Sequence, residues 1–126
     1  MHENEIAKIV VDCAFKVHKN LGPGLLESTY QVCLCHELVE VGLNIVSEKA
    51  LPVIYNDVKL EAGYRIDILV ENKVIIEIKA VEVLHDIHMA QILTYLKLSD
   101  KKLGFLINFN VALFKSGIKR VINGFL

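Results

Sequence analysis

Two neighbouring segments of the sequence, Tyr64–Glu71 and Val74–Ala80, carry side chains that could do metal or acid–base chemistry. Both segments are rich in β-branched and apolar residues, which predicts two strands of a β-hairpin. Side chains alternate between the faces of a strand, so Glu77 and Lys79 share one face of the second strand. A strand this apolar is expected to be covered on both sides, where a charge is costly unless it is paired or binds a cation. We therefore expect a functional site here.

The first strand of this hairpin adds Asp67, and Arg65 shares its face. Asp67 could join a cation site, or it could form an ion pair with Arg65 or with a lysine across the hairpin. The dipeptide Asn72-Lys73 is expected to form the turn. Apolar residues are expected on the opposite faces: Tyr64, Ile66, Ile68 and Val70 on the first strand, and Val74, Ile76 and Ile78 on the second.

A helix is predicted from about Leu25 to Val41, and it carries another acid near its first turn. Glu27 and Tyr30 lie three residues apart, so they are neighbours on the helix surface. Glu27 could simply be stabilised by the positive end of the helix dipole, or its carboxylate could be directed at the sheet. The apolar stripe of this helix contains Leu26, Tyr30, Cys33, Leu34 and Leu38, with Val41 as a further candidate.

A third helix is predicted from about Asp86 to Leu98, with Asp86 as its N-cap. His88, Gln91 and Tyr95 follow one another at intervals of three and four, so they form one stripe. These residues could support the site, although a pair such as Gln91 and Tyr95 is common on helix surfaces.

The remaining elements follow from hydrophobic periodicity and turn residues. An amphipathic helix is predicted over Glu5–Asn20, followed by the helix breaker Leu21–Gly24. The segment Asn44–Tyr55 is expected to be a strand pair or one bent strand, with Pro52 at an edge or bulge. The other expected strands are Val58–Ala62, Lys102–Phe109 and Lys115–Asn123, and the turn Asn56-Asp57 precedes the first of these.

Composition favours one globular domain, spanning residues 1–126, because 53% of the residues are hydrophobic and 23% are charged. The formal net charge of -1 provides no overall basic field for a polyanion. No leader peptide or membrane-spanning run is evident, so we expect a soluble, cytoplasmic protein. The cysteines suit reduced core thiols. Cys33 and Cys35 point about 200° apart on a helix, so with His36 they are a poor metal site.

Several motifs resemble those of one small family. Gly24–Tyr30 matches the signature of the GxxExxY proteins, which are assigned to the PD-(D/E)xK nuclease superfamily. The resemblance covers nearly the whole chain and continues through Leu51–Tyr55, Gly63–Asp67, Glu77–Lys79, Gln91–Tyr95, Leu106–Phe109 and Gly117–Arg120. One departure is Ile66, which stands where many members have proline.

With the extra N-terminal helix and the last strand predicted from the sequence, the expected order is helix, helix, three strands, helix and two strands, as a mixed β-sheet flanked by helices. The resemblance implies a restriction-endonuclease-like α/β fold, whose core is a helix, three antiparallel strands, a second helix and a further strand. It implies catalytic roles for Asp67, Glu77 and Lys79. The implied cofactor is Mg²⁺, with Mn²⁺ as the alternative, and the implied metal ligands are Glu27, Asp67, Glu77 and the carbonyl of Ile78. Substrate-binding or supporting roles fall to Tyr30, Arg65, His88, Gln91 and Tyr95.

The function expected from this resemblance is metal-dependent hydrolysis of phosphodiester bonds, in DNA ahead of RNA. Such chemistry needs a hard cation, and carboxylate oxygens are the ligands that Mg²⁺ prefers. The near-neutral charge favours two alternatives. One is a nuclease-fold module that binds nucleic acid or a protein partner without efficient cleavage. The other is an enzyme that needs a homodimer or a partner to hold its substrate. A purely structural acidic cluster would bind no cation at all.

Overall fold

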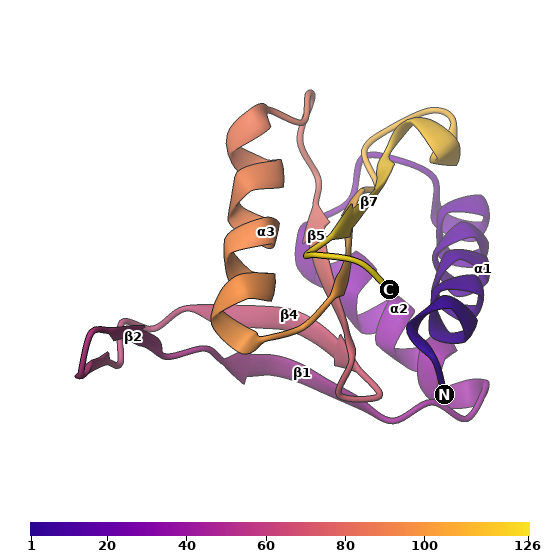
Figure 1. Ribbon diagram of the computed structural model, residues 1–126. Coiled ribbons are helices and arrows are strands. Elements are labelled where there is room, and N and C mark those ends of the chain that lie inside the picture. Colours follow the sequence, from indigo (N-terminus) through magenta and orange to yellow (C-terminus); the bar gives the residue numbers. More distant parts are fainter.

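The computed structural model describes residues 1–126 and has three layers (Figure 1). A β-sheet lies between two helices, α1 (Glu3–Leu21) and α2 (Glu27–Glu40), on one face and the helix α3 (Asp86–Ser99) on the other. Its strands are β1 (Ile45–Ala50), β4 (Arg65–Val70), β5 (Val74–Lys79), β6 (Leu103–Asn108) and β7 (Ile118–Ile122). The short 3₁₀ helix η1 (Phe114–Ser116) occupies the start of the last predicted strand.

The strands of this sheet lie in the order β1-β4-β5-β6-β7. β5 and β6 are parallel, whereas every other neighbouring pair is antiparallel. Parallel neighbours need a crossover connection, and α3 provides it between β5 and β6. The predicted α/β architecture, a mixed sheet flanked by helices, is therefore confirmed. β5 is the central strand, so Val74 to Ile78 are all buried.

Two hydrophobic cores hold the layers together, one on each face of the sheet. The larger core contains 20 buried residues from α1, α2 and the sheet, and the smaller core contains 9 residues beneath α3. Val74, Ile76 and Ile78 lie in the larger core, while Ile75 lies in the smaller one. This alternation confirms the predicted faces of β5, and it directs Glu77 and Lys79 towards the α3 side of the sheet.

The apolar stripe of α2 is shorter than the sequence predicted. Tyr30, Leu34 and Leu38 are buried, but Leu26 is 73% exposed and Val41 is 54% exposed. Leu26 and Val41 are the N-cap and C-cap of the helix. Because cap residues have left the helical backbone conformation, the helical spacing no longer determines which way their side chains point.

A small hairpin is inserted between β1 and β4 and projects beyond the sheet (Figure 1). Its strands, β2 (Val53–Tyr55) and β3 (Val58–Leu60), pair only with each other. The segment predicted over residues 44–55 does form two strands, but these are β1 and β2, which do not pair together. The break falls beside Pro52, which has no N–H for a ladder hydrogen bond. The two strands of this hairpin are additional to the order given with the family resemblance, although the strand predicted over Val58–Ala62 does contain β3.

The helix α3 starts at Asp86 as predicted, but its cap and the turn before β5 differ from the prediction. The N-cap of α3 is His85, not Asp86, and its N–H donates to Nδ1 of His88 over 3.0 Å. The turn between β4 and β5 includes Glu71 as well as Asn72, because both residues have left-handed backbones with φ of 51° and 54°. Asparagine tolerates that conformation, whereas nothing in the local sequence singled out Glu71.

Candidate functional site

The candidate site lies where β4 and β5 separate. The two strands pair from Val70↔Val74 as far as Ile68↔Ile76, and the ladder ends there. Continuing the same register would place Asp67 opposite Glu77. Instead, the N–H of Asp67 donates to Oε2 of Glu77 over 2.8 Å, and the N–H of Ile78 donates to Oδ2 of Asp67 over 2.8 Å. Both carboxylates are thus fixed by backbone donors that the separating strands leave free.

The strands are irregular at this same level. Ile66 was predicted to share a face with Ile68, but it packs in the smaller core while Ile68 packs in the larger one. On β1, the register places Glu48 opposite Asp67, and Glu48 has a left-handed backbone with φ of 55°. A residue other than glycine pays about 1–2 kcal/mol for that conformation. The distortion therefore crosses β1 and β4 beside the two carboxylates.

Burial raises the pKa of both central acids. The pKa of Glu77 rises from 4.5 to about 8, because its side chain is desolvated and because the charge of Asp67 lies nearby. The N–H of Asp67 and the ammonium of Lys79 lower it only in part. Burial also raises the pKa of Asp67, and the charges of Glu48 and Glu27 add to this effect. Without a cation, Glu77 therefore keeps its proton at neutral pH.

Glu27 reaches this site from the start of α2. Its Oε2 accepts a hydrogen bond of 3.3 Å from the N–H of Ala80, directly after β5. The carboxylate is therefore directed at the end of the sheet, as one of the two sequence interpretations held. One helical turn later, Nε2 of Gln31 donates to the carbonyl of Asp67 over 3.2 Å and to Ser47 over 3.1 Å. Gln31 was not among the predicted site residues, although its spacing of four from Glu27 places both on one helix face.

Tyr30 is a support for this helix end, with no exposed surface. Its hydroxyl donates to the carbonyl of Gly22 over 2.6 Å and accepts from the N–H of Leu25 over 3.1 Å. Its ring stacks on Phe109 with centroids 4.6 Å apart. These contacts hold the loop before α2, and the loop determines where Glu27 begins the helix. A buried ring cannot contact a substrate directly, so Tyr30 is a positioning residue.

The two cationic candidates behave differently. Lys79 is half-buried and forms no salt bridge, although its charge lowers the pKa of both Glu77 and Asp67. Arg65 is exposed, and its Nη1 donates to the carbonyl of Glu48 over 3.2 Å. The alternative of an Asp67–Arg65 ion pair is therefore wrong. The structure brings Lys79 to the carboxylates and ties Arg65 to the distorted segment of β1.

On α3, the predicted stripe is divided between two environments. Nε2 of Gln91 donates to the hydroxyl of Tyr95 over 3.3 Å, so these two residues form a pair. Tyr95 packs in the smaller core with Ile66 and Ile75, on the side of the sheet to which Glu77 is directed. Burial raises the pKa of Tyr95, and the charges of Glu77 and Asp67 add to this effect. His88 instead lies in the first turn of α3, where its ring nitrogen Nδ1 is occupied by the N–H of His85.

The donor chemistry of the site suits a hard cation. No three acidic, histidine or cysteine side chains lie close enough to hold one ion together. However, Oδ1 of Asp67 and Oε1 of Glu77 have no protein hydrogen-bond partner, and no fully buried side-chain oxygen lacks one. Both oxygens therefore reach solvent. Two such oxygens on adjacent strands, with Glu27 nearby, match the ligands that Mg²⁺ prefers.

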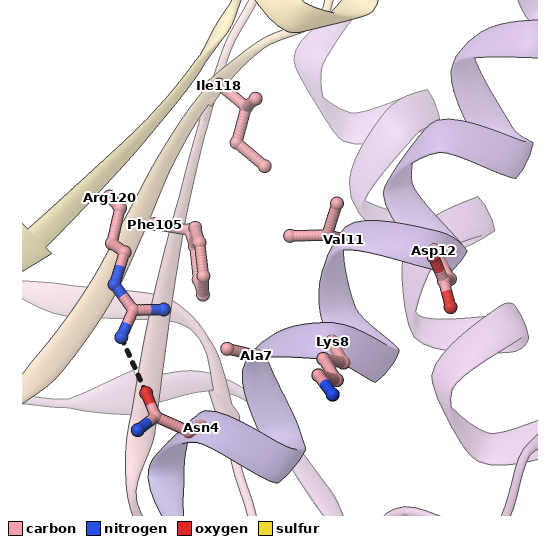
Figure 2. A pocket seen from close by; sticks show the side chains of 8 residues that line it. All are labelled: Asn4, Ala7, Lys8, Val11, Asp12, Phe105, Ile118 and Arg120. Atoms are coloured by element: carbon pink, nitrogen blue, oxygen red, sulfur yellow. Dashed lines mark hydrogen bonds between the residues drawn. The ribbon is translucent and has the colours of Figure 1, made fainter.

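A separate hollow lies away from this site. It measures about 670 Å³ and lies between α1 and the strands β6 and β7 (Figure 2). Phe105 and Ile118 contribute to its apolar wall, and Arg120 donates to Oδ1 of Asn4 over 2.7 Å at its edge. Phe105 belongs to the core on the α1 side, whereas Glu77 is directed to the α3 side. The sheet therefore separates this hollow from the carboxylates.

The helix, sheet and carboxylate arrangement defines a restriction-endonuclease-like α/β protein. A sequence model of the PD-(D/E)XK nuclease superfamily matches residues 4–121, and the chain belongs to that superfamily. No curated protein matches the sequence. None of the helices has the length and apolar character needed to span a membrane.

Proposed function

We propose that the protein is a metal-dependent nuclease that hydrolyses phosphodiester bonds in DNA, ahead of RNA. The observation that carries this proposal is the pair of Asp67 and Glu77, which is held by backbone donors where two central strands separate. Membership of the PD-(D/E)XK nuclease superfamily supports the same chemistry. The finer resemblance to GxxExxY proteins agrees with the buried Tyr30 in the first turn of the helix that begins at Glu27.

The proposed ligands of Mg²⁺, or alternatively Mn²⁺, are Glu27, Asp67, Glu77 and the carbonyl of Ile78. Such a cation supplies Lewis acidity and lowers the pKa of a bound water. The chain's own part is to hold the donor oxygens in place and to exclude bulk water from Glu77, which is 5% exposed. Lys79 forms no ion pair, so its ammonium is free to orient the attacking water or to stabilise charge on the phosphate.

The remaining candidates have supporting or binding roles in this proposal. Gln91 and Tyr95 offer hydrogen-bonding groups beside the acids, and Tyr30 positions the start of α2. Arg65 is exposed and could contact a phosphate while it holds the backbone of β1. His88 lies in the first turn of the same helix and is partly exposed, so its ring could meet the nucleic-acid backbone.

The test is cleavage of labelled single-stranded and duplex DNA and RNA with Mg²⁺ or Mn²⁺. Asp67→Asn is the most informative variant, because an amide oxygen can still accept from the N–H of Ile78. Asp67→Asn and Lys79→Ala should each abolish cleavage, as should a chelator. Matched changes at exposed positions, Asp57→Asn and Lys97→Ala, should leave it intact. Cleavage that survives Asp67→Asn would refute the assignment.

A nuclease-fold module without efficient cleavage is the second candidate. The net charge of -1 favours it, because efficient binding of nucleic acid rests largely on contacts between basic side chains and phosphates. Such a module would bind Mg²⁺ or Mn²⁺ in calorimetric titration but would cut none of the four substrates. Cleavage that appears only with a partner protein, or only in a homodimer, would instead indicate an enzyme that cannot hold its substrate alone.

A further inference from the structure

An apolar hollow of about 350 Å³ lies between α3 and the residues just before β4. We call it the tyrosine hollow, because Tyr64 and Tyr95 form part of its wall together with Val53, Ile87, Gln91 and Leu98. The rings of Tyr64 and Tyr95 meet edge to face, with centroids 6.3 Å apart. Tyr64 is 47% exposed and Ile87 is 70% exposed. An aromatic ring and an aliphatic side chain are thus presented to solvent in one concave place.

The tyrosine hollow lies on the same face of the sheet as the Glu77 side chain, because both are on the α3 side. Gln91 and Tyr95 line the hollow, and Tyr95 packs in the smaller core with Ile66, the neighbour of Asp67, and with Ile75, which shares a strand face with Glu77. Tyr64 is three residues before Asp67 on the same stretch of chain, and its carbonyl accepts a 2.9 Å hydrogen bond from the N–H of Leu51. The Tyr64 ring therefore projects from a backbone segment that is hydrogen-bonded next to the sheet.

The charge of the protein indicates how a nucleic acid would be held here. Duplex binding depends largely on lysine and arginine contacts to phosphates, yet the net charge is -1 and no lysine or arginine lines this hollow. Single strands are also bound by stacking of their bases on aromatic rings. Stacking of one base changes affinity by about 5- to 150-fold and requires a base that is not paired in a duplex.

We propose that the tyrosine hollow receives one unpaired base next to the phosphate that the carboxylates address, so that the substrate is single-stranded or locally unpaired nucleic acid. This inference rests on the proposed nuclease function and specifies its substrate class. Tyr64 supplies the stacking face, the aliphatic side chains cover the base, and Gln91 offers an amide to its polar edge. Selection of single strands then comes from the shape and apolar character of the hollow.

The absence of tryptophan from the chain provides a clean probe. Tyr64→Trp introduces one indole at the hollow, and Tyr55→Trp introduces one at the projecting hairpin, where Tyr55 is 69% exposed. Fluorescence is titrated with a short oligodeoxythymidine strand and with a duplex of equal length, in chelator so that no metal-dependent cleavage occurs. We expect the single strand to quench Tyr64→Trp strongly, the duplex to quench it weakly, and neither to quench Tyr55→Trp.

Affinity measurements complete the test. Tyr64→Ala should weaken binding of the single strand by about 5- to 150-fold, whereas Tyr64→Phe and Tyr55→Ala should stay within about twofold of the native protein. The inference would be overturned if the duplex quenched Tyr64→Trp as strongly as the single strand does. It would also be overturned if Tyr64→Ala bound the single strand with native affinity, or if the hollow bound a protein partner and no nucleic acid. The two proposals fail separately: quenching without cleavage in Mg²⁺ removes the nuclease function, and cleavage without quenching removes the base site.

Discussion

Glu77 should make the metal-free protein less stable as the pH rises. Its pKa is 4.5 in the unfolded chain and about 8 in the folded protein. Between these values the folded state holds a proton that the unfolded state has lost, so the free energy of unfolding falls with increasing pH. Each pKa unit corresponds to about 1.36 kcal/mol, so the loss from this one group is about 4–5 kcal/mol. That is a large part of the stability of a small domain.

The variant Glu77→Gln isolates this contribution. Glutamine has no proton to lose, and its side-chain oxygen can still accept the 2.8 Å hydrogen bond from the N–H of Asp67. In the presence of chelator, the variant and the native protein should have similar free energies of unfolding near pH 5. Near pH 8 the variant should be more stable by several kcal/mol, with about 4–5 kcal/mol as the upper bound.

Urea unfolding followed by circular dichroism at several pH values measures this difference. Glu82→Gln is the control, because Glu82 is exposed and loses little water on folding. Its difference from the native protein should be flat with pH. Saturating Mg²⁺ should reverse the order near pH 8, since a cation stabilises the ionised form of the native site only. A flat difference for Glu77→Gln would refute the idea that its charge is desolvated on folding.

Three further substitutions test separate parts of the site. Lys79→Ala removes the positive charge that lowers the pKa of Glu77, so calorimetry should find that the pH midpoint of Mg²⁺ binding moves to higher pH. Tyr30→Phe keeps the ring stack but loses two hydrogen bonds to the loop before α2, and urea unfolding should show a loss of about 1–3 kcal/mol. Glu48→Gly should stabilise the metal-free protein by about 0.5–1 kcal/mol through relief of its left-handed backbone, and yet weaken metal binding. If Glu48→Gly leaves the free energy of unfolding unchanged while Glu48→Gln changes it, the explanation by backbone strain is contradicted.

The sequence predicted β5 well because both of its faces are buried. The alternation of side chains over Val74–Lys79 is regular, so it assigned each residue to the correct face of the sheet, including Glu77 and Lys79. The same rule failed on β4 at Ile66, because the ladder with β5 ends beside Asp67 and the strand changes course there. The periodicity of apolar residues in the sequence predicts the faces of a regular strand, but it does not predict where two strands stop pairing.

Residues that act through the backbone were the hardest to predict. Glu48 lies in a strand-like stretch, and only the register opposite Asp67 together with its left-handed backbone reveals its position beside the acids. Tyr30 was expected near the site because of its spacing from Glu27, but its two hydrogen bonds to the preceding loop explain that spacing better. In both cases the informative contacts depend on the folded backbone, which no spacing rule describes.

Three unfavourable features occur at one level of the sheet, on the neighbouring strands β1, β4 and β5. Glu48 has a strained backbone, Asp67 lies where its strand loses its ladder, and Glu77 is buried with a raised pKa. Valine or threonine in a regular strand conformation would build a more stable β1 than Glu48 does. Strain of this kind is typical of functional sites. A divalent cation would offset the repulsion between the acids and allow Glu77 to ionise, so metal binding and folding stability should be linked. The difference in the free energy of unfolding between the metal-free and the metal-bound protein would then measure this linkage.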